Sequence, residues 1–191
     1  MPRFDADWID SMLRPERRGA EGPEETIARL RLRDGDFVAD VGCGPGYFAL
    51  PAARAVAPRG VVYAVDREPR MLEFVRQRAR AEGIGNLTAV TAEETIPLAD
   101  ESIDLAFCAL VLHDLADPAP MIRELVRITR RGGRVAIVEW LPEPQESRPN
   151  RLAPARLATR FAGVAVQPPE VTLLGPRQYL AVFGLSAPFL K

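Results

Sequence analysis

Histidine, cysteine and lysine are scarce in this sequence. Its 191 residues include one histidine (His113), two cysteines (Cys43 and Cys108) and one lysine (Lys191). A single imidazole excludes every metal site that needs two, and we expect no metal centre. Two cysteines cannot build a disulfide framework, and such sparse usage is typical of the reducing cytoplasm. We therefore expect a cytoplasmic protein.

The sequence also lacks long apolar runs and an excess of charge of one sign. No stretch approaches the roughly 18 apolar residues of a membrane span. The charged N-terminus MPRFDADWID is unlike a signal peptide. Arginine and lysine together number 25, aspartate and glutamate 26, and the formal net charge is -1. This balance offers no basic surface for nucleic acid, so no nucleic-acid partner and no membrane span are expected.

Apolar strands alternate with amphipathic helices through most of the chain. The expected strands are 37–41, 61–65, 87–90, 103–112 and 135–138, and the expected helices are 23–33, 47–56, 69–81 and 118–129. The last of these helices should end at Gly132-Gly133. Such alternation is typical of a doubly wound parallel sheet.

The pattern changes after Trp140. Four prolines punctuate a loop, residues 155–162 follow as a short helix, and residues 164–174 and 178–183 follow as strands. A turn at Pro176 should pair these two strands as an antiparallel hairpin at the sheet edge. The predicted fold class is therefore α/β, with a mostly parallel sheet of seven strands and a C-terminal antiparallel hairpin.

Three glycines at alternate positions separate the first strand from the helix behind it. Gly42, Gly44 and Gly46 can adopt positive φ and let a ligand lie against the backbone. The following helix offers free N–H groups at its start. Asp66 ends the next strand, where a carboxylate can accept hydrogen bonds from both hydroxyls of a ribose. The pattern predicts a nucleoside-containing cofactor.

Two cofactor classes share this geometry. Dinucleotide enzymes need a further glycine where this chain has Tyr47, because the pyrophosphate lies against the helix start. Asp40, just before the loop, would repel a pyrophosphate and attract a cationic amino-acid group. The charge pattern therefore favours S-adenosylmethionine, which carries an ammonium, a sulfonium and no phosphate.

From about Asp34 to Val138 the sequence resembles the class I S-adenosylmethionine-dependent methyltransferases, in particular those of ubiquinone and menaquinone synthesis and their small-molecule relatives. The matching segments are DVGCGPG (40–46), AVD (64–66), TAEE (91–94) with PL (97–98) and SID (102–104), LVLHDL (110–115) and RRGGR (130–134). The resemblance implies a Rossmann-like fold and methyl transfer to a small-molecule acceptor. Thr91 stands where many relatives have an Asp or Asn that bonds the adenine.

The resemblance, together with the positions of residues at the strand ends and in the N-terminal segment, suggests site residues. The cofactor set is Asp40, Gly42, Cys43, Gly44, Gly46, Asp66, Arg67, Ala92, Glu93 and Cys108. The acceptor set is Trp8, Met12, His113, Glu139 and Trp140, and the catalytic candidates are His113 and Asp114. His113 is either a general base, because imidazole titrates near neutral pH, or a structural residue at the rim.

Two other function classes stay open at this point. An NAD(P)-dependent oxidoreductase would need the dinucleotide glycine spacing and a proton donor such as a Tyr/Lys pair, and the sequence has neither. A non-catalytic cofactor-binding module could share the fold.

The expected organisation is one domain over 1–191, with an N-terminal helical cap (1–33), a cofactor-binding core (34–140), and a substrate-side loop and closing hairpin (141–191). The sequence names neither the methylated atom nor the oligomeric state.

Overall fold

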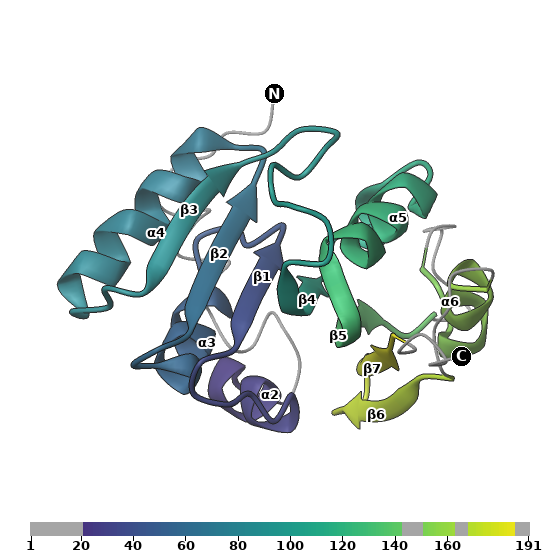
Figure 1. Ribbon diagram of the computed structural model, residues 1–191. Coiled ribbons are helices and arrows are strands. Elements are labelled where there is room, and N and C mark those ends of the chain that lie inside the picture. The colour runs from purple at the N-terminus through teal and green to yellow at the C-terminus, as the bar shows by residue number, and fades with distance from the viewer. Residues whose placement is uncertain (1–20, 143–150, 163–167, 186–191) are drawn as a thin grey trace, which may run out of the picture.

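Seven strands form one sheet in the computed structural model, which describes residues 21–142, 151–162 and 168–185 (Figure 1). Their order across the sheet is β3-β2-β1-β4-β5-β7-β6. The strands are β1 (Phe37–Val41), β2 (Val61–Asp66), β3 (Leu87–Thr91), β4 (Ile103–Ala109), β5 (Thr129–Trp140), β6 (Glu170–Leu174) and β7 (Gln178–Gly184). The first five pair in parallel, and β7 runs antiparallel to both β5 and β6. The predicted fold class is confirmed.

Helices cover both faces of the sheet. Residues of α2 (Pro23–Arg29), α3 (Ala49–Val56) and α4 (Pro69–Ala81) join one buried apolar cluster, and residues of α5 (Ala119–Ile128) and α6 (Pro154–Arg160) join the other. Along β5, Ala136 and Val138 belong to the first cluster, whereas Val135 and Ile137 belong to the second. Burial on both faces of the sheet explains why central strands such as β5 contain an apolar run without alternation.

Two element ends differ from the sequence prediction because the backbone turns early. The helix expected over 23–33 ends at Arg29, and Arg31 has a φ of +50°. The strand expected over 103–112 ends at Ala109, because Leu110 has a φ of +58° that turns the chain out of the sheet. A single 3₁₀ turn, Leu112–Asp114, follows. This early exit lifts residues 110–114 to the carboxyl edge of the sheet.

The expected helix end at Gly132-Gly133 is wrong. Helix α5 already ends at Ile128, and Thr129 pairs with Ile103 as the first residue of β5. The glycines lie inside β5, where the register with β4 shifts. A Cβ on Gly133 would lie 2.8 Å from the carbonyl oxygens of Arg130 and Asp104, so this bulge requires a close backbone approach.

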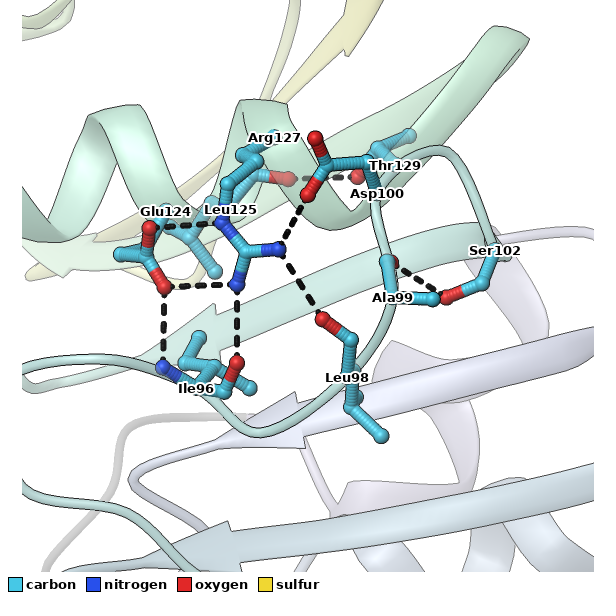
Figure 2. Close-up of polar contacts among 9 residues, drawn as sticks. All are labelled: Ile96, Leu98, Ala99, Asp100, Ser102, Glu124, Leu125, Arg127 and Thr129. Carbon is cyan, nitrogen blue, oxygen red and sulfur yellow. Dashed lines mark hydrogen bonds and ion pairs between the residues drawn. The ribbon is translucent and has the colours of Figure 1, made fainter.

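Arg127 of α5 fastens the loop between β3 and β4 to the body of the domain (Figure 2). Its guanidinium donates to both Glu124 carboxylate oxygens at 2.8 Å and to the carbonyl oxygens of Ile96 and Leu98 at 2.8 and 2.9 Å. It also donates to Asp100 at 2.6 Å, and Glu124 in turn accepts from the Ile96 N–H at 2.9 Å. Ile96 is 3% exposed, so this network fixes a buried part of the loop.

Replacing Arg127 with methionine is expected to lower the free energy of unfolding by about 1–3 kcal/mol, because two carbonyl groups and two carboxylates lose a charged donor. Arg131→Met is the matched control, since among the described residues the ion pair of Arg131 is with Glu101 alone and both side chains are more than half exposed. Its cost should stay within about 0.5 kcal/mol. Urea unfolding of both variants measures the difference, and equal costs would contradict a structural role for the Arg127 network.

No helix in the three described ranges has the length and apolar composition to cross a bilayer.

Candidate active site

A cavity of about 350 Å³ opens at the carboxyl ends of β1, β2 and β4. In Figure 1 the arrowheads of β1, β2 and β3 point to this same edge of the sheet. The lining residues come from the strand ends, the glycine loop, α4, the β3–β4 loop, the segment after β4 and α5: Val41, Gly42, Gly44, Val65, Asp66, Arg67, Glu68, Met71, Ala92, Glu93, Glu94, Ile96, Leu110, Val111, Asp114, Leu115 and Met121. This position, beside the switch point of a doubly wound sheet, is where such folds bind ligands.

The glycine loop leaves β1 in a shape that other residues cannot adopt without strain. Gly42 and Gly46 have φ values of +75° and +83°. A Cβ on Gly42 would lie 2.4 Å from Cγ2 of Val111, which is shorter than any normal contact between two carbon atoms. The N–H groups of Gly42 and Cys43 donate to the Val65 carbonyl at 2.8 and 3.0 Å, which ties the loop to the end of β2.

Asp66 braces this loop from β2. Its Oδ2 accepts from the Gly44 N–H at 2.8 Å, and its Oδ1 accepts from the Glu68 N–H at 2.9 Å. A carboxylate has about four lone-pair positions, so each oxygen keeps capacity for a ligand hydroxyl. Asp66 also lines the cavity, and the backbone bonds fix its orientation there.

Six of the ten residues expected to bind the cofactor line this one cavity, namely Gly42, Gly44, Asp66, Arg67, Ala92 and Glu93. Asp40, Cys43 and Cys108 are not among its lining residues and are buried, at 2%, 5% and 0% exposure. Burial raises the pKa of both thiols, and nearby carboxylates raise it further, so neither cysteine forms a thiolate nucleophile near neutral pH. Gly46 packs against the start of α3, where a Cβ would meet Leu50 at 2.5 Å.

The apolar wall of the cavity was missed by sequence reasoning. Met71, Ile96 and Met121 approach from α4, the β3–β4 loop and α5. Their positions depend on how three separate elements pack, and no local pattern signals it. Leu110 and Val111 did carry a signal, because they extend the apolar run of β4 beyond the length of a normal strand.

His113 lies close to Asp114 and to the end of β5. Its Nδ1 is 2.8 Å from Oε2 of Glu139, and its Nε2 is 3.6 Å from Oδ1 of Asp114. Asp114 lines the cavity, whereas His113 is not among the lining residues and its side chain is 8% exposed. Sequence reasoning placed His113, Asp114 and Glu139 at one edge of the sheet, and the structure brings all three together.

Trp140 follows Glu139 at the end of β5. The guanidinium carbons of Arg151 and Arg177 lie 5.3 and 5.8 Å from its ring centroid, within the range of cation–π attraction. Tyr179 donates its hydroxyl proton to the Leu152 carbonyl at 2.6 Å, and burial raises its pKa, so this phenol stays protonated. Trp8 and Met12, the other expected acceptor residues, lie outside the described residues.

A larger cavity of about 520 Å³ lies at the other end of the sheet, lined by Asp100, Glu101, Val126, Arg127, Thr129, Arg131 and Leu185. Its arginines pair with its own carboxylates, in the ion pairs Arg127–Asp100 and Arg131–Glu101. This hollow also lacks the glycine loop and the strand-end carboxylate. The cavity beside Asp66 is therefore the candidate site.

The fold and this site define a class I S-adenosylmethionine-dependent methyltransferase. Residues 39–137 match the family described as methyltransferase domain. Because the match spans half of the chain, the chain belongs to this family. The family and its structural relatives mark S-adenosylmethionine as the cofactor, and the comparisons give no support to an oxidoreductase.

Three similar proteins illustrate the relationship. A SAM dependent methyltransferase from Aquifex aeolicus has a solved structure with a TM-score of 0.81 and 26% identity, covering 95% of this chain and 98% of that one. The demethylmenaquinone methyltransferase of Geobacillus kaustophilus is 30% identical over 124 residues, which are 64% of this chain and 53% of that protein. An uncharacterized 37.1 kDa protein in transposon TN4556 of Streptomyces fradiae is 40% identical over 114 residues, which are 58% of this chain and 32% of that protein. The alignments thus span about half or less of the length of these two curated relatives.

Proposed function

We propose that this chain transfers the methyl group of S-adenosylmethionine to a small-molecule acceptor in the cytoplasm. The observation that carries the proposal is the glycine loop, braced by Asp66 at 2.8 Å, at the mouth of a cavity of about 350 Å³. That volume is in the range of small-ligand sites. A relative named demethylmenaquinone methyltransferase favours a quinone-like ring as the first acceptor class to test.

The residues around the cavity fit this cofactor in charge and shape. We assign the ribose hydroxyls to Asp66, and the adenine side to Arg67, Ala92 and Glu93. Gly42 and Gly44 give the methionine half access to the backbone, and the buried carboxylate of Asp40 supplies negative charge for its ammonium. Gly46, Cys43 and Cys108 shape the floor beneath.

S-adenosylmethionine, when bound, supplies a methyl group on a cationic sulfonium. The chain's own contribution is to exclude water and align the acceptor, because the sulfonium would lose its positive charge as the new bond forms. We assign His113 and Asp114 to the catalytic group. We assign Trp140 to the acceptor side.

Replacing Asp66 with alanine is expected to weaken binding of S-adenosylhomocysteine by roughly tenfold to a hundredfold. A hydrogen bond to a charged group contributes about 1.5–3 kcal/mol, which corresponds to that range. Calorimetry measures the affinity. Asp34→Ala is the control, because Asp34 pairs with Arg59 at the surface away from the cavity, and it should bind like the wild type. Unchanged affinity in a folded Asp66→Ala variant would contradict the assignment of the ribose.

Methyl transfer itself needs a direct test. The protein is incubated with S-adenosylmethionine and a panel of quinols, phenols, amines and thiols, and mass spectrometry follows each acceptor. The expected result is a gain of one methyl group by one class, together with S-adenosylhomocysteine. Binding of S-adenosylmethionine without transfer to any acceptor would favour a non-catalytic module. Tighter binding of NAD or NADP would overturn the cofactor assignment.

A further inference from the structure

Glu139 is a buried carboxylate at the end of β5. It is 1% exposed, and its oxygens have three polar neighbours. Oε2 lies 2.8 Å from Nδ1 of His113 and accepts from the Trp140 N–H at 3.2 Å, while Oε1 accepts from the His113 N–H at 3.3 Å. A charge this deeply buried is stable only when its hydrogen-bonding capacity is satisfied. Two of these three contacts come from one residue, His113.

This contact sets the proton positions on the imidazole. An ionised carboxylate only accepts hydrogen bonds, so Nδ1 must carry a proton at 2.8 Å from Oε2. The neutral ring then has its lone pair on Nε2. Nε2 lies 3.6 Å from Oδ1 of Asp114, and Asp114 lines the cofactor cavity. The basic nitrogen of the ring therefore faces Asp114, a residue that lines the cavity, and the protonated nitrogen faces Glu139.

The charges around His113 favour the protonated ring. Burial lowers the pKa of the imidazole, but the hydrogen bond and charge of Glu139 and the charge of Asp114 outweigh it, and Arg151 opposes them. The net effect raises the pKa above its ordinary value. These groups come from β5, the turn after β4 and the segment before α6. A buried imidazolium beside Glu139 is thus a stable proton carrier.

We propose that Glu139 is a positioning residue that holds His113 as the Nδ1–H tautomer, so that Nε2 takes a proton from acceptors that arrive with a hydrogen on the atom to be methylated. This inference rests on the proposed methyl transfer. The acceptor's X–H proton moves to Nε2 as X bonds to the methyl carbon. The carbon–sulfur bond breaks, and its electron pair stays on sulfur. The site therefore selects hydroxyl-type acceptors, such as phenols and enols, over acceptors without a removable proton.

The single histidine makes the test direct, because every imidazole signal in the nitrogen-15 NMR spectrum of the full chain belongs to His113. In the wild type, the neutral ring should be the Nδ1–H tautomer, and its titration midpoint should lie above the ordinary value of about 6.5. In Glu139→Gln the negative charge is lost at nearly constant volume, so the midpoint should fall. The control Glu101→Gln removes an exposed carboxylate that pairs with Arg131, and it should change neither quantity.

An Nε2–H tautomer in the wild type would overturn the proposal, as would an unchanged midpoint in a folded Glu139→Gln variant. The wild-type tautomer decides the question even if that variant fails to fold. This readout needs no acceptor, so it is separate from the test of methyl transfer.

Kinetics then distinguish a base from a structural pair. A base must be neutral to act, so kcat should rise with pH through the pKa of His113. In Glu139→Gln this rise should move to lower pH by the displacement seen in the NMR titration, and the plateau should fall on the order of 10²-fold or more. The affinity for S-adenosylhomocysteine should not change. Methyl transfer with identical pH profiles in both proteins would make the pair structural, and no transfer to any acceptor would overturn the base role together with the proposed function.

Discussion

Replacing His113 with alanine is expected to lower kcat by about 10²–10⁴-fold, the usual contribution of a positioned general base. Affinity for S-adenosylhomocysteine should hardly change, because the loop and Asp66 contacts belong to β1 and β2 whereas His113 follows β4. Steady-state kinetics with an acceptor from the panel, together with calorimetry, measure both quantities. The variant also leaves the Glu139 carboxylate buried without its imidazole partner, so its stability should be measured alongside.

His113→Gln provides the comparison for this effect. Its amide can donate to Glu139 and thus support the buried carboxylate, but it cannot take up a proton near neutral pH. If His113 is the base, both variants should lose turnover to a similar extent, although the glutamine variant is the more stable. A raised KM with an intact kcat would instead assign His113 to shaping the acceptor site. With both parameters intact, His113 would lie outside the site, and Asp114 would be the next candidate.

Replacing Gly42 with alanine is expected to destabilise the domain by roughly 2–5 kcal/mol and to weaken cofactor binding tenfold or more. A left-handed backbone costs an L-residue about 1–2 kcal/mol, and overpacking adds about 1–3 kcal/mol. The structural reasons are the φ of +75° and the 2.4 Å approach of the new Cβ to Val111. Relief of this clash must move either the glycine loop or Val111, and both line the cavity. Urea unfolding and calorimetry measure the two effects.

Gly132 offers a matched control with nearly the same backbone angle. Its φ is +76°, and a Cβ there has no heavy atom within 4 Å. Gly132→Ala should therefore show the backbone cost alone, about 1–2 kcal/mol, with unchanged cofactor affinity. Val111→Ala in the Gly42→Ala background removes the colliding methyl groups and should recover part of the lost stability. Equal losses of stability in Gly42→Ala and Gly132→Ala would mean that the glycine loop adjusts to the new Cβ without cost. That result would contradict a rigid cofactor-binding loop.

The glycine loop and Asp66 could be predicted because their signals are local. The loop follows β1 directly, and Asp66 ends the next strand, so the short β1–α3–β2 unit contains both partners of the 2.8 Å contact. Because β1 and β2 are parallel neighbours with their carboxyl ends at one edge of the sheet, the glycine loop and Asp66 must meet at that edge. Helix α4 was likewise predicted with its observed bounds, because Pro69 starts it and its apolar positions recur on one face.

Signals that depend on distant partners were weaker. The strand pattern predicted a C-terminal hairpin, and the structure confirms it. The pattern did not predict that β7 lies between β5 and β6, antiparallel to both. The glycine pair at 132–133 looked like a helix end, but pairing of Thr129 with Ile103 began the strand first. Sheet pairing outweighs such a local stop signal, because it satisfies backbone groups of two strands together with buried side chains.

The sequence by itself determined the class of this protein, since a glycine loop, a strand-end carboxylate and alternating elements are each encoded within a few neighbouring residues. Only the tertiary structure shows what Glu139 contacts. Sequence reasoning assigned it to the acceptor surface, as a polar residue just after a strand, whereas the folded chain buries it and turns it toward His113, 26 positions away. The reason is physical: a local pattern fixes which edge of a sheet a residue reaches, but the pairing of β4 with β5 fixes which atom the Glu139 carboxylate meets.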